Sequence, residues 1–158
     1  MPGIPPALTP EQFEQVANAI DPNAKVISTH KLVGGLACRM DVLKLELGRR
    51  DSYEVVTRQY FSEAGNHVPR ESFVLRALSA NNIPAPKLVL DEEVTGRIFD
   101  RPGIVISHLD GSPNLEPLDP SDWARQVAAA MADLHSSLPS AALPASSAAR
   151  RTHCAPVH

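Results

Sequence analysis

The sequence predicts an α+β fold in which one helix crosses a five-stranded antiparallel sheet, with a further helix at each end of the chain. Three extended segments follow one another with only short turns between them, which is typical of an antiparallel meander. A helix with an apolar stripe then precedes two more short extended segments. With 158 residues, the chain is long enough for one domain with a single core.

The first helix is expected over residues 9–20. Thr9 can act as its N-cap, Pro10 suits the first turn, and Gln12 stands where the partner in a capping box belongs. Four apolar residues then recur at helical spacing: Phe13, Val16, Ala17 and Ile20. Asp21 and Pro22 end the helix.

The first strand is expected over residues 24–33, before a glycine turn at Gly34 and Gly35. The third strand is expected over residues 53–61, after a polar turn. Between them, alternation of leucine with charged residues predicts a second strand with one buried face, on the leucines Leu43, Leu45 and Leu47.

The second half of the chain begins with a helix expected over residues 69–80, which stops at Asn81 because Pro84 and Pro86 bar its continuation. Two more strands are expected over residues 86–93 and 103–109. A last helix starts near Asp119 and carries an apolar stripe of Trp123, Val127, Met131 and Leu134. We therefore expect four regions: a flexible N-terminus (1–8), the lobe holding the sheet (9–116), a linker helix (117–138) and a disordered Ala/Ser/Pro-rich tail (139–158).

Composition excludes several classes of function. The formal charge of −3 gives no basic surface for nucleic acid, and no apolar stretch is long enough to span a membrane. No signal peptide is visible at the N-terminus. The two cysteines, Cys38 and Cys154, lie far apart in sequence and in different contexts, and the simplest expectation is a reduced, cytoplasmic protein without a disulfide framework.

The segment from Tyr53 to Leu78 carries the strongest functional signal. It pairs a strand bearing a lone inward arginine, Arg58, with a helix bearing a lone acid, Glu71. A carboxylate on the apolar stripe of a helix is costly unless a cation meets it. We therefore expect Arg58 to contact Glu71, an arrangement that kinases use to grip nucleotide phosphates.

Four stretches of sequence, in this order, resemble the aminoglycoside phosphotransferase and choline-kinase-like family. They are KLVGGLACRMDVLKLEL, YEVVTRQYF, RESFVLRALSANNIPAPKLVL and GIVISHLDGSP. Each is weak alone, but their order and spacing are specific, and the resemblance runs from Leu32 to His135. It implies a protein-kinase-like N-terminal lobe and ATP-dependent transfer of a phosphoryl group to a hydroxyl of a small molecule.

The resemblance also implies roles for individual residues. Gly34 and Gly35 match the turn that covers the nucleotide phosphates. Arg58 matches the basic residue that grips them, and Glu71 matches the acid that positions it. Val56 would form part of the roof over the adenine ring.

The adenine edge would be held by the backbone of the hinge, which the resemblance places at Ser107, His108 and Leu109. Ser107 stands where the family often has an acid, so a side-chain contribution is not implied there. The expected ligands are ATP and, by resemblance, magnesium. The acceptor is left open because the family holds it largely in the second lobe.

One departure from the family pattern is large. The sequence has no His-Gly-Asp catalytic loop, and only 49 residues follow Leu109. The general base and the metal ligands of phosphoryl transfer are therefore missing, so we expect a truncated lobe with no catalytic residues and little activity alone. The alternative is a non-catalytic interaction module that self-associates or pairs with a separately encoded second lobe.

Ordinary structural roles compete with several of these interpretations. The glycine turn can be a simple hairpin turn, and the Arg58–Glu71 contact can be a structural ion pair. His108, Asp110 and Asn114 imitate a catalytic loop, but their spacing is one residue short, and they follow a strand where the hinge belongs. The six histidines show no metal-ligand spacing, and no metal site is expected. Cys38 is most simply an inert thiol.

Overall fold

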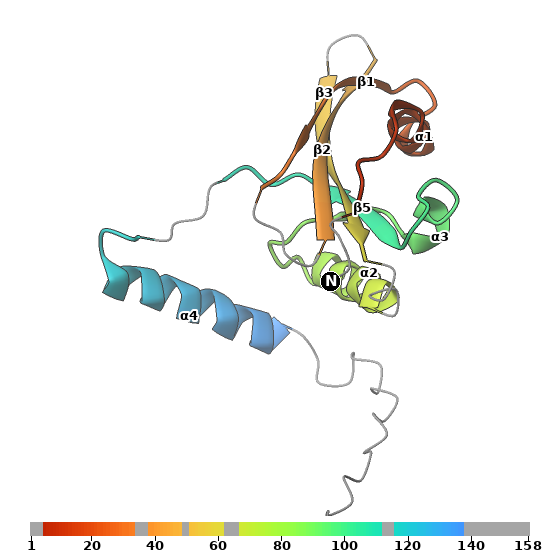
Figure 1. The fold of residues 1–158 in the computed structure, drawn as a ribbon. Coiled ribbons are helices and arrows are strands. Elements are labelled where there is room, and N and C mark those ends of the chain that lie inside the picture. Colours follow the sequence, from red (N-terminus) through yellow and green to blue (C-terminus); the bar gives the residue numbers. More distant parts are fainter. Residues whose placement is uncertain (1–4, 34–37, 49–50, 62–66, 112–115, 138–158) are drawn as a thin grey trace, which may run out of the picture.

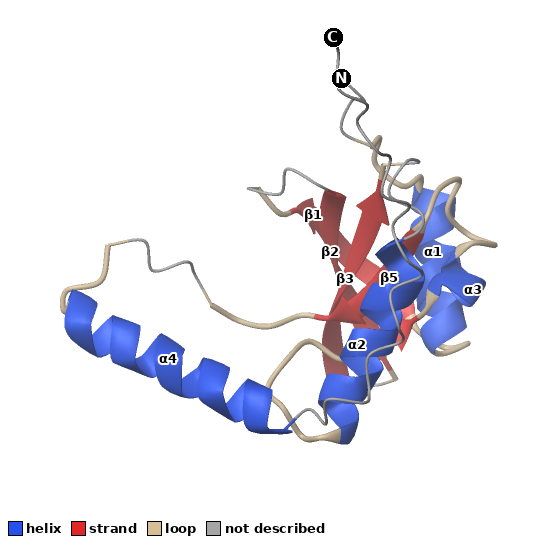
Figure 2. Ribbon diagram, turned by 90° about the horizontal axis from the view of Figure 1, so that it is seen from below, coloured by secondary structure: helices blue, strands red, loops and turns tan. Residues whose placement is uncertain are grey.

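The computed structural model describes residues 5–33, 38–48, 51–61, 67–111 and 116–137, and Figures 1 and 2 show them from two directions. Its elements are α1 (Pro10–Ile20), β1 (Lys25–Lys31), β2 (Cys38–Leu47), β3 (Asp51–Tyr60), α2 (Val68–Ala80), β4 (Leu88–Leu90), α3 (Glu92–Thr95), β5 (Gly103–Ser107) and α4 (Pro120–Ser137). All five strands pair antiparallel in the order β1-β2-β3-β5-β4. The predicted α+β fold with the sheet of a kinase-like N-terminal lobe is therefore confirmed.

One face of the sheet packs against α1, which lies together with α3 beside the sheet (Figure 2). The capping box forms as predicted, because Gln12 N donates to Thr9 Oγ1 at 3.2 Å and Thr9 N donates to Gln12 Oε1 at 2.9 Å. The helix then buries Phe13, Val16 and Ala17. Leu8 belongs to the same core cluster, so packing begins before the first helix.

The opposite face of the sheet packs against α2, and this is the face that carries the candidate site. Alternation along β3 directs every second side chain to this face, so Val56, Arg58 and Tyr60 share it. Val56 and Tyr60 join a second core cluster with Val68 and Leu75 of α2. The remaining buried members of this cluster are Cys38, Val42, Ile104 and Ile106.

The fourth strand is shorter than predicted. It ends at Leu90, whereas the sequence predicted a strand over residues 86–93. Asp91 acts as an N-cap instead, since its Oδ1 accepts from the N–H groups of Glu93 and Val94 at 3.2 Å each. This cap starts the one-turn helix α3. The prediction was wrong because the acidic residues 91–93 were taken as the end of the strand, whereas they cap and begin this helix.

The last helix, α4, stands apart from the sheet (Figure 1). Three large apolar residues on it remain exposed: Trp123 (46%), Val127 (39%) and Met131 (52%). A groove of about 660 Å³ separates part of this helix from the loop after α2; Met131, Leu134, Leu78 and Ile83 are among its lining residues. The predicted apolar stripe of this helix therefore exists but is only partly covered.

Candidate functional site

Arg58 and Glu71 are in contact, as the sequence predicted. Arg58 lies on the central strand β3 between Met40 of β2 and Ile104 of β5, its partners in the two ladders. Its Nη1 donates to Glu71 Oε1. The two side chains are 31% and 25% exposed, so the pair lies at the edge of the core and is reachable from solvent.

Tyr60 supplies a second hydrogen-bond donor to the carboxylate of Glu71. Its hydroxyl donates to Glu71 Oε2, so both carboxylate oxygens have a partner on β3. The Tyr60 ring also lies beneath the guanidinium, with Arg58 Cζ 5.4 Å from its centroid, which is cation–π distance. Burial raises the pKa of Tyr60, and the hydrogen bond to Glu71 raises it further, so the hydroxyl remains a donor at neutral pH.

The third partner of Arg58 is Cys38 at the start of β2. Arg58 Nε donates to Cys38 Sγ at 3.4 Å. Burial by itself lowers the pKa of Arg58, but the bond to Cys38 and the nearby Tyr60 and Glu71 outweigh it, so the pKa is raised overall. The guanidinium is thus a permanent cation, and contacts with Glu71, Tyr60 and Cys38 fix its orientation.

In this arrangement Arg58 keeps N–H groups that can still donate hydrogen bonds. The guanidinium has five N–H groups, and the described residues supply partners for its Nε and Nη1 atoms. The unused groups on Nη2 can donate to an anion without disturbing Glu71. A fixed cation with spare donors is suited to oxygens of a phosphate.

The remaining predicted positions lie around this pair. Val56 is on the same face as Arg58 and is 4% exposed, next to Ile106 of β5 and Val42 of β2 in the ladders. Gly34 and Gly35 lie outside the described residues. Leu32 N donates to Met40 O at 3.0 Å, which closes the described part of the β1–β2 hairpin beside that turn.

The expected hinge, Ser107 to Leu109, leaves the sheet at the end of β5. Two of its N–H groups are already used, because Ser107 N donates to Lys87 O at 2.8 Å and His108 N donates to Glu54 O at 3.1 Å. Leu109 follows outside the strand and is 58% exposed. Of these three residues, Leu109 is therefore the one whose backbone N–H can donate to a ligand.

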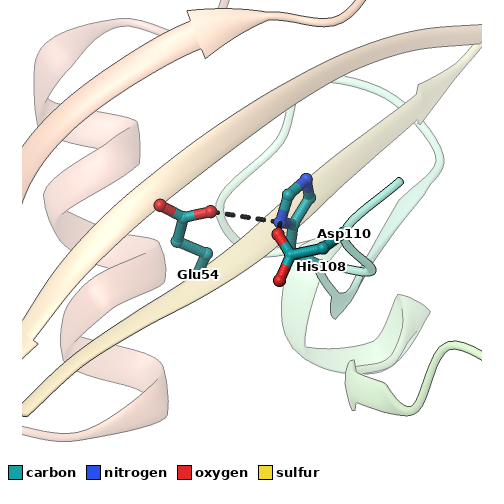
Figure 3. Close-up of side chains that lie close together, drawn as sticks. All are labelled: Glu54, His108 and Asp110. Carbon is teal, nitrogen blue, oxygen red and sulfur yellow. Dashed lines mark ion pairs between the residues drawn. The ribbon is translucent and has the colours of Figure 1, made fainter. Parts of the chain in front are cut away.

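The structure also brings together three residues that the sequence did not connect: Glu54, His108 and Asp110. His108 Nδ1 lies 3.1 Å from Glu54 Oε2 and 3.6 Å from Asp110 Oδ1. Figure 3 shows the Glu54 carboxylate joined to this ring nitrogen by a dashed line, with Asp110 drawn beside the ring. Strand pairing creates this cluster, since Val55 faces Ser107 in the β3–β5 ladder and Glu54 therefore faces His108.

Comparison with known proteins gives a match to a protein family. The family model described as "Phosphotransferase enzyme family" (APH) matches residues 41–156, which is most of the chain. No curated protein and no solved structure matches significantly. Within the described residues, no helix is both long and apolar enough to cross a membrane. The sheet, the Arg58–Glu71 pair and this match agree, and the chain belongs to the phosphotransferase enzyme family.

Proposed function

We propose that residues 9–116 form the nucleotide-binding lobe of an ATP-dependent phosphotransferase of the aminoglycoside phosphotransferase type. The observation that carries this proposal is the Arg58 guanidinium, held by Glu71, Tyr60 and Cys38 with its Nη2 atom free of partners among the described residues. Kinases position a strand cation with a helix acid in this way to bind phosphates. In this proposal Gly34 and Gly35 cover the phosphates and Glu71 positions Arg58.

The adenine ring would lie against Val56, at the hinge side of Arg58. The backbone of residues 107–109 would hold its edge. Because Ser107 and His108 donate their N–H groups within the sheet, their contribution would come from carbonyl oxygens, and Leu109 would supply the donor. In this proposal the hinge therefore offers the adenine one donor, the N–H of Leu109, and two acceptors, the carbonyl oxygens of Ser107 and His108.

Magnesium does not fit the residues around Arg58. Both oxygens of Glu71, the acid beside Arg58, are engaged by Arg58 and Tyr60. Magnesium prefers carboxylate oxygens that are free to coordinate it. In the proposal the metal ligands and the general base would therefore come from a second lobe that this sequence does not contain.

The chain alone is accordingly proposed to bind nucleotide weakly and to turn over little or none. One lobe encloses one side of a ligand, whereas good small-molecule sites bury most of it. A phosphate-release assay with the purified chain tests this. Background release in both the unaltered chain and an Arg58→Ala variant is expected. Turnover that Arg58→Ala abolishes would show that this chain is a complete enzyme.

A second candidate function, an interaction module, is favoured by the exposed apolar face of α4. Trp123, Val127 and Met131 lie on one side of that helix and remain 39–52% exposed. Clusters of exposed apolar residues mark protein interaction surfaces. Light scattering across a range of concentrations should then show association that Trp123→Ser together with Met131→Ser removes. A strictly monomeric chain at every concentration would rule out self-association.

A further inference from the structure

We propose that Glu54, His108 and Asp110 form a binding site for a divalent transition-metal ion of the zinc type, separate from the magnesium that phosphoryl transfer uses. Their donor atoms, one from each side chain, all lie within 4.8 Å of one another. The site joins the central strand β3 to the hinge segment that follows β5 (Figure 3). It uses the side chain of His108, whereas the proposed nucleotide site uses the backbone of residues 107–109, and it needs no nucleotide to form.

The distances within the cluster suit a tetrahedral ion. Zinc binds nitrogen and oxygen ligands at about 2.0–2.2 Å, so ligand atoms at neighbouring corners of a tetrahedron lie about 3.4 Å apart. The two separations from His108 Nδ1 are 3.1 Å to Glu54 Oε2 and 3.6 Å to Asp110 Oδ1, on either side of that value. An ion can therefore enter with small side-chain adjustments.

The backbone fixes two of the three ligands before any ion binds. Glu54 and His108 are adjacent across the β3–β5 ladder, and His108 N donates to Glu54 O at 3.1 Å. Their side chains are 36% and 21% exposed. Asp110 lies two residues beyond His108 and is fully exposed, so it can close on an ion from the solvent side. Two ligands placed by strand pairing and a third on the solvent side leave a fourth position for water.

Charge around the cluster favours a cation. Among the described residues, the ion pairs that Glu54 and Asp110 form are both with His108. With a neutral imidazole, two carboxylates remain uncompensated, and a dication would offset both. Lys44 faces Glu54 in the β2–β3 ladder without forming an ion pair with it, so it is the competing cation.

The donor set selects the class of metal. One imidazole nitrogen with two carboxylate oxygens suits zinc and similar transition metals, whereas magnesium and calcium prefer oxygen ligands alone.

The site is also displaced from the phosphate-binding position. Glu54 precedes Arg58 by four residues on the same face of β3, which is about 13 Å along a strand.

The experiment titrates the tag-free full chain with Zn²⁺ by calorimetry and with Co²⁺ by visible absorption, which reports tetrahedral ligation directly. The background carries His153→Ala, Cys154→Ser and His158→Ala, so that the tail cannot supply ligands. One equivalent of metal should bind. His108→Ala and Glu54→Gln should each weaken binding by at least about tenfold, the effect typical of losing a ligand or its support. Lys44→Met should strengthen it.

Two further variants keep the test decisive. Asp110 is fully exposed, so Asp110→Asn leaves the core intact and should still weaken binding and alter the Co²⁺ spectrum. His30 is exposed on β1, and His30→Ala is the matched control that should change nothing. The proposal is overturned if the chain binds no Zn²⁺ in the micromolar range. It is equally overturned if Asp110→Asn and His108→Ala bind both metals as the background does.

Discussion

Arg58 and Tyr60 hold opposite oxygens of one carboxylate, that of Glu71 on α2. They lie two residues apart on β3 and so project from the same face of the sheet. The Tyr60 ring lies under the guanidinium as well. Glu71 is therefore fixed from two sides, and its position relative to β3 depends on both residues.

Replacing Tyr60 with phenylalanine tests this dependence. Tyr60→Phe keeps the ring but removes the donor to a carboxylate, and hydrogen bonds to charged groups contribute about 1.5–3 kcal/mol. Because Glu71 keeps 25% of its side chain exposed, water replaces part of the bond, and we expect a loss of about 1–2 kcal/mol in urea unfolding. Tyr53→Phe, on the other face of β3, is the matched control. Equal stabilities for the two variants would contradict the bond.

The pH dependence of stability should reveal the same hydroxyl. Burial and the bond to Glu71 raise the pKa of Tyr60 in the folded chain above its ordinary value of 10.0. The folded state then keeps a proton that the unfolded state releases, so this stabilisation is complete below about pH 10 and is lost as pH rises further. Urea midpoints measured from neutral to strongly alkaline pH should fall less steeply in Tyr60→Phe. Identical slopes in the two proteins would count against a raised pKa.

The ion pair of Arg39 and Asp41 stabilises the opposite face of the sheet. Arg39 Nε donates to Asp41 Oδ2 at 2.7 Å and Nη2 donates to Oδ1 at 2.9 Å, and their side chains are 15% and 5% exposed. Breaking an enclosed pair costs about 3–5 kcal/mol, and the partial exposure of Arg39 reduces this to about 2–3 kcal/mol for Asp41→Ala. Asp133→Ala on α4 is the exposed control. A change below about 0.5 kcal/mol, as for ordinary surface sites, would show that the pair is not structural.

Gly103 marks a close approach between β5 and its surroundings. A Cβ at this position would lie 2.6 Å from Phe99 Cδ2 and 2.7 Å from Arg58 O. Gly103→Ala should therefore displace the β3 backbone at Arg58 and cost about 1–3 kcal/mol, as overpacking typically does. Chemical denaturation measures this loss, with Ser28→Ala on the exposed edge strand β1 as the control. Unchanged stability would mean that β3 and β5 are less closely packed than described.

The Arg58–Glu71 contact could be predicted because two local periodicities determine it. Strand alternation put Arg58 on the face of Val56, and helical spacing put Glu71 beside Leu75 on the face that packs on the sheet. The charge on an otherwise apolar surface then required a partner. The capping box at Thr9 was predictable for the same reason, since it depends on residues three apart.

The rest of the site depends on register, which local patterns do not give. Glu54 and His108 meet only because β3 pairs with β5 in one particular alignment, and Cys38 reaches Arg58 through the pairing of β2 with β3. A one-residue slip would send these side chains to the other face. Tyr60 differs from these residues, because we did not predict a role for it although its spacing from Arg58 places it on the same face. Helix α3 was not predicted, because a helix of a single turn has too few residues to show a helical period of apolar residues.

Equilibrium binding of ATP and of adenosine, compared between the unaltered chain and Arg58→Ala, tests the central claim most directly. If Arg58 grips phosphates, Arg58→Ala should weaken ATP binding by at least about tenfold, the loss of one charge-assisted contact, and leave adenosine binding unchanged. Equal ATP affinity in the two proteins, with both folded, would contradict the account. Arg58 would then be a structural cation that fastens α2 to the sheet.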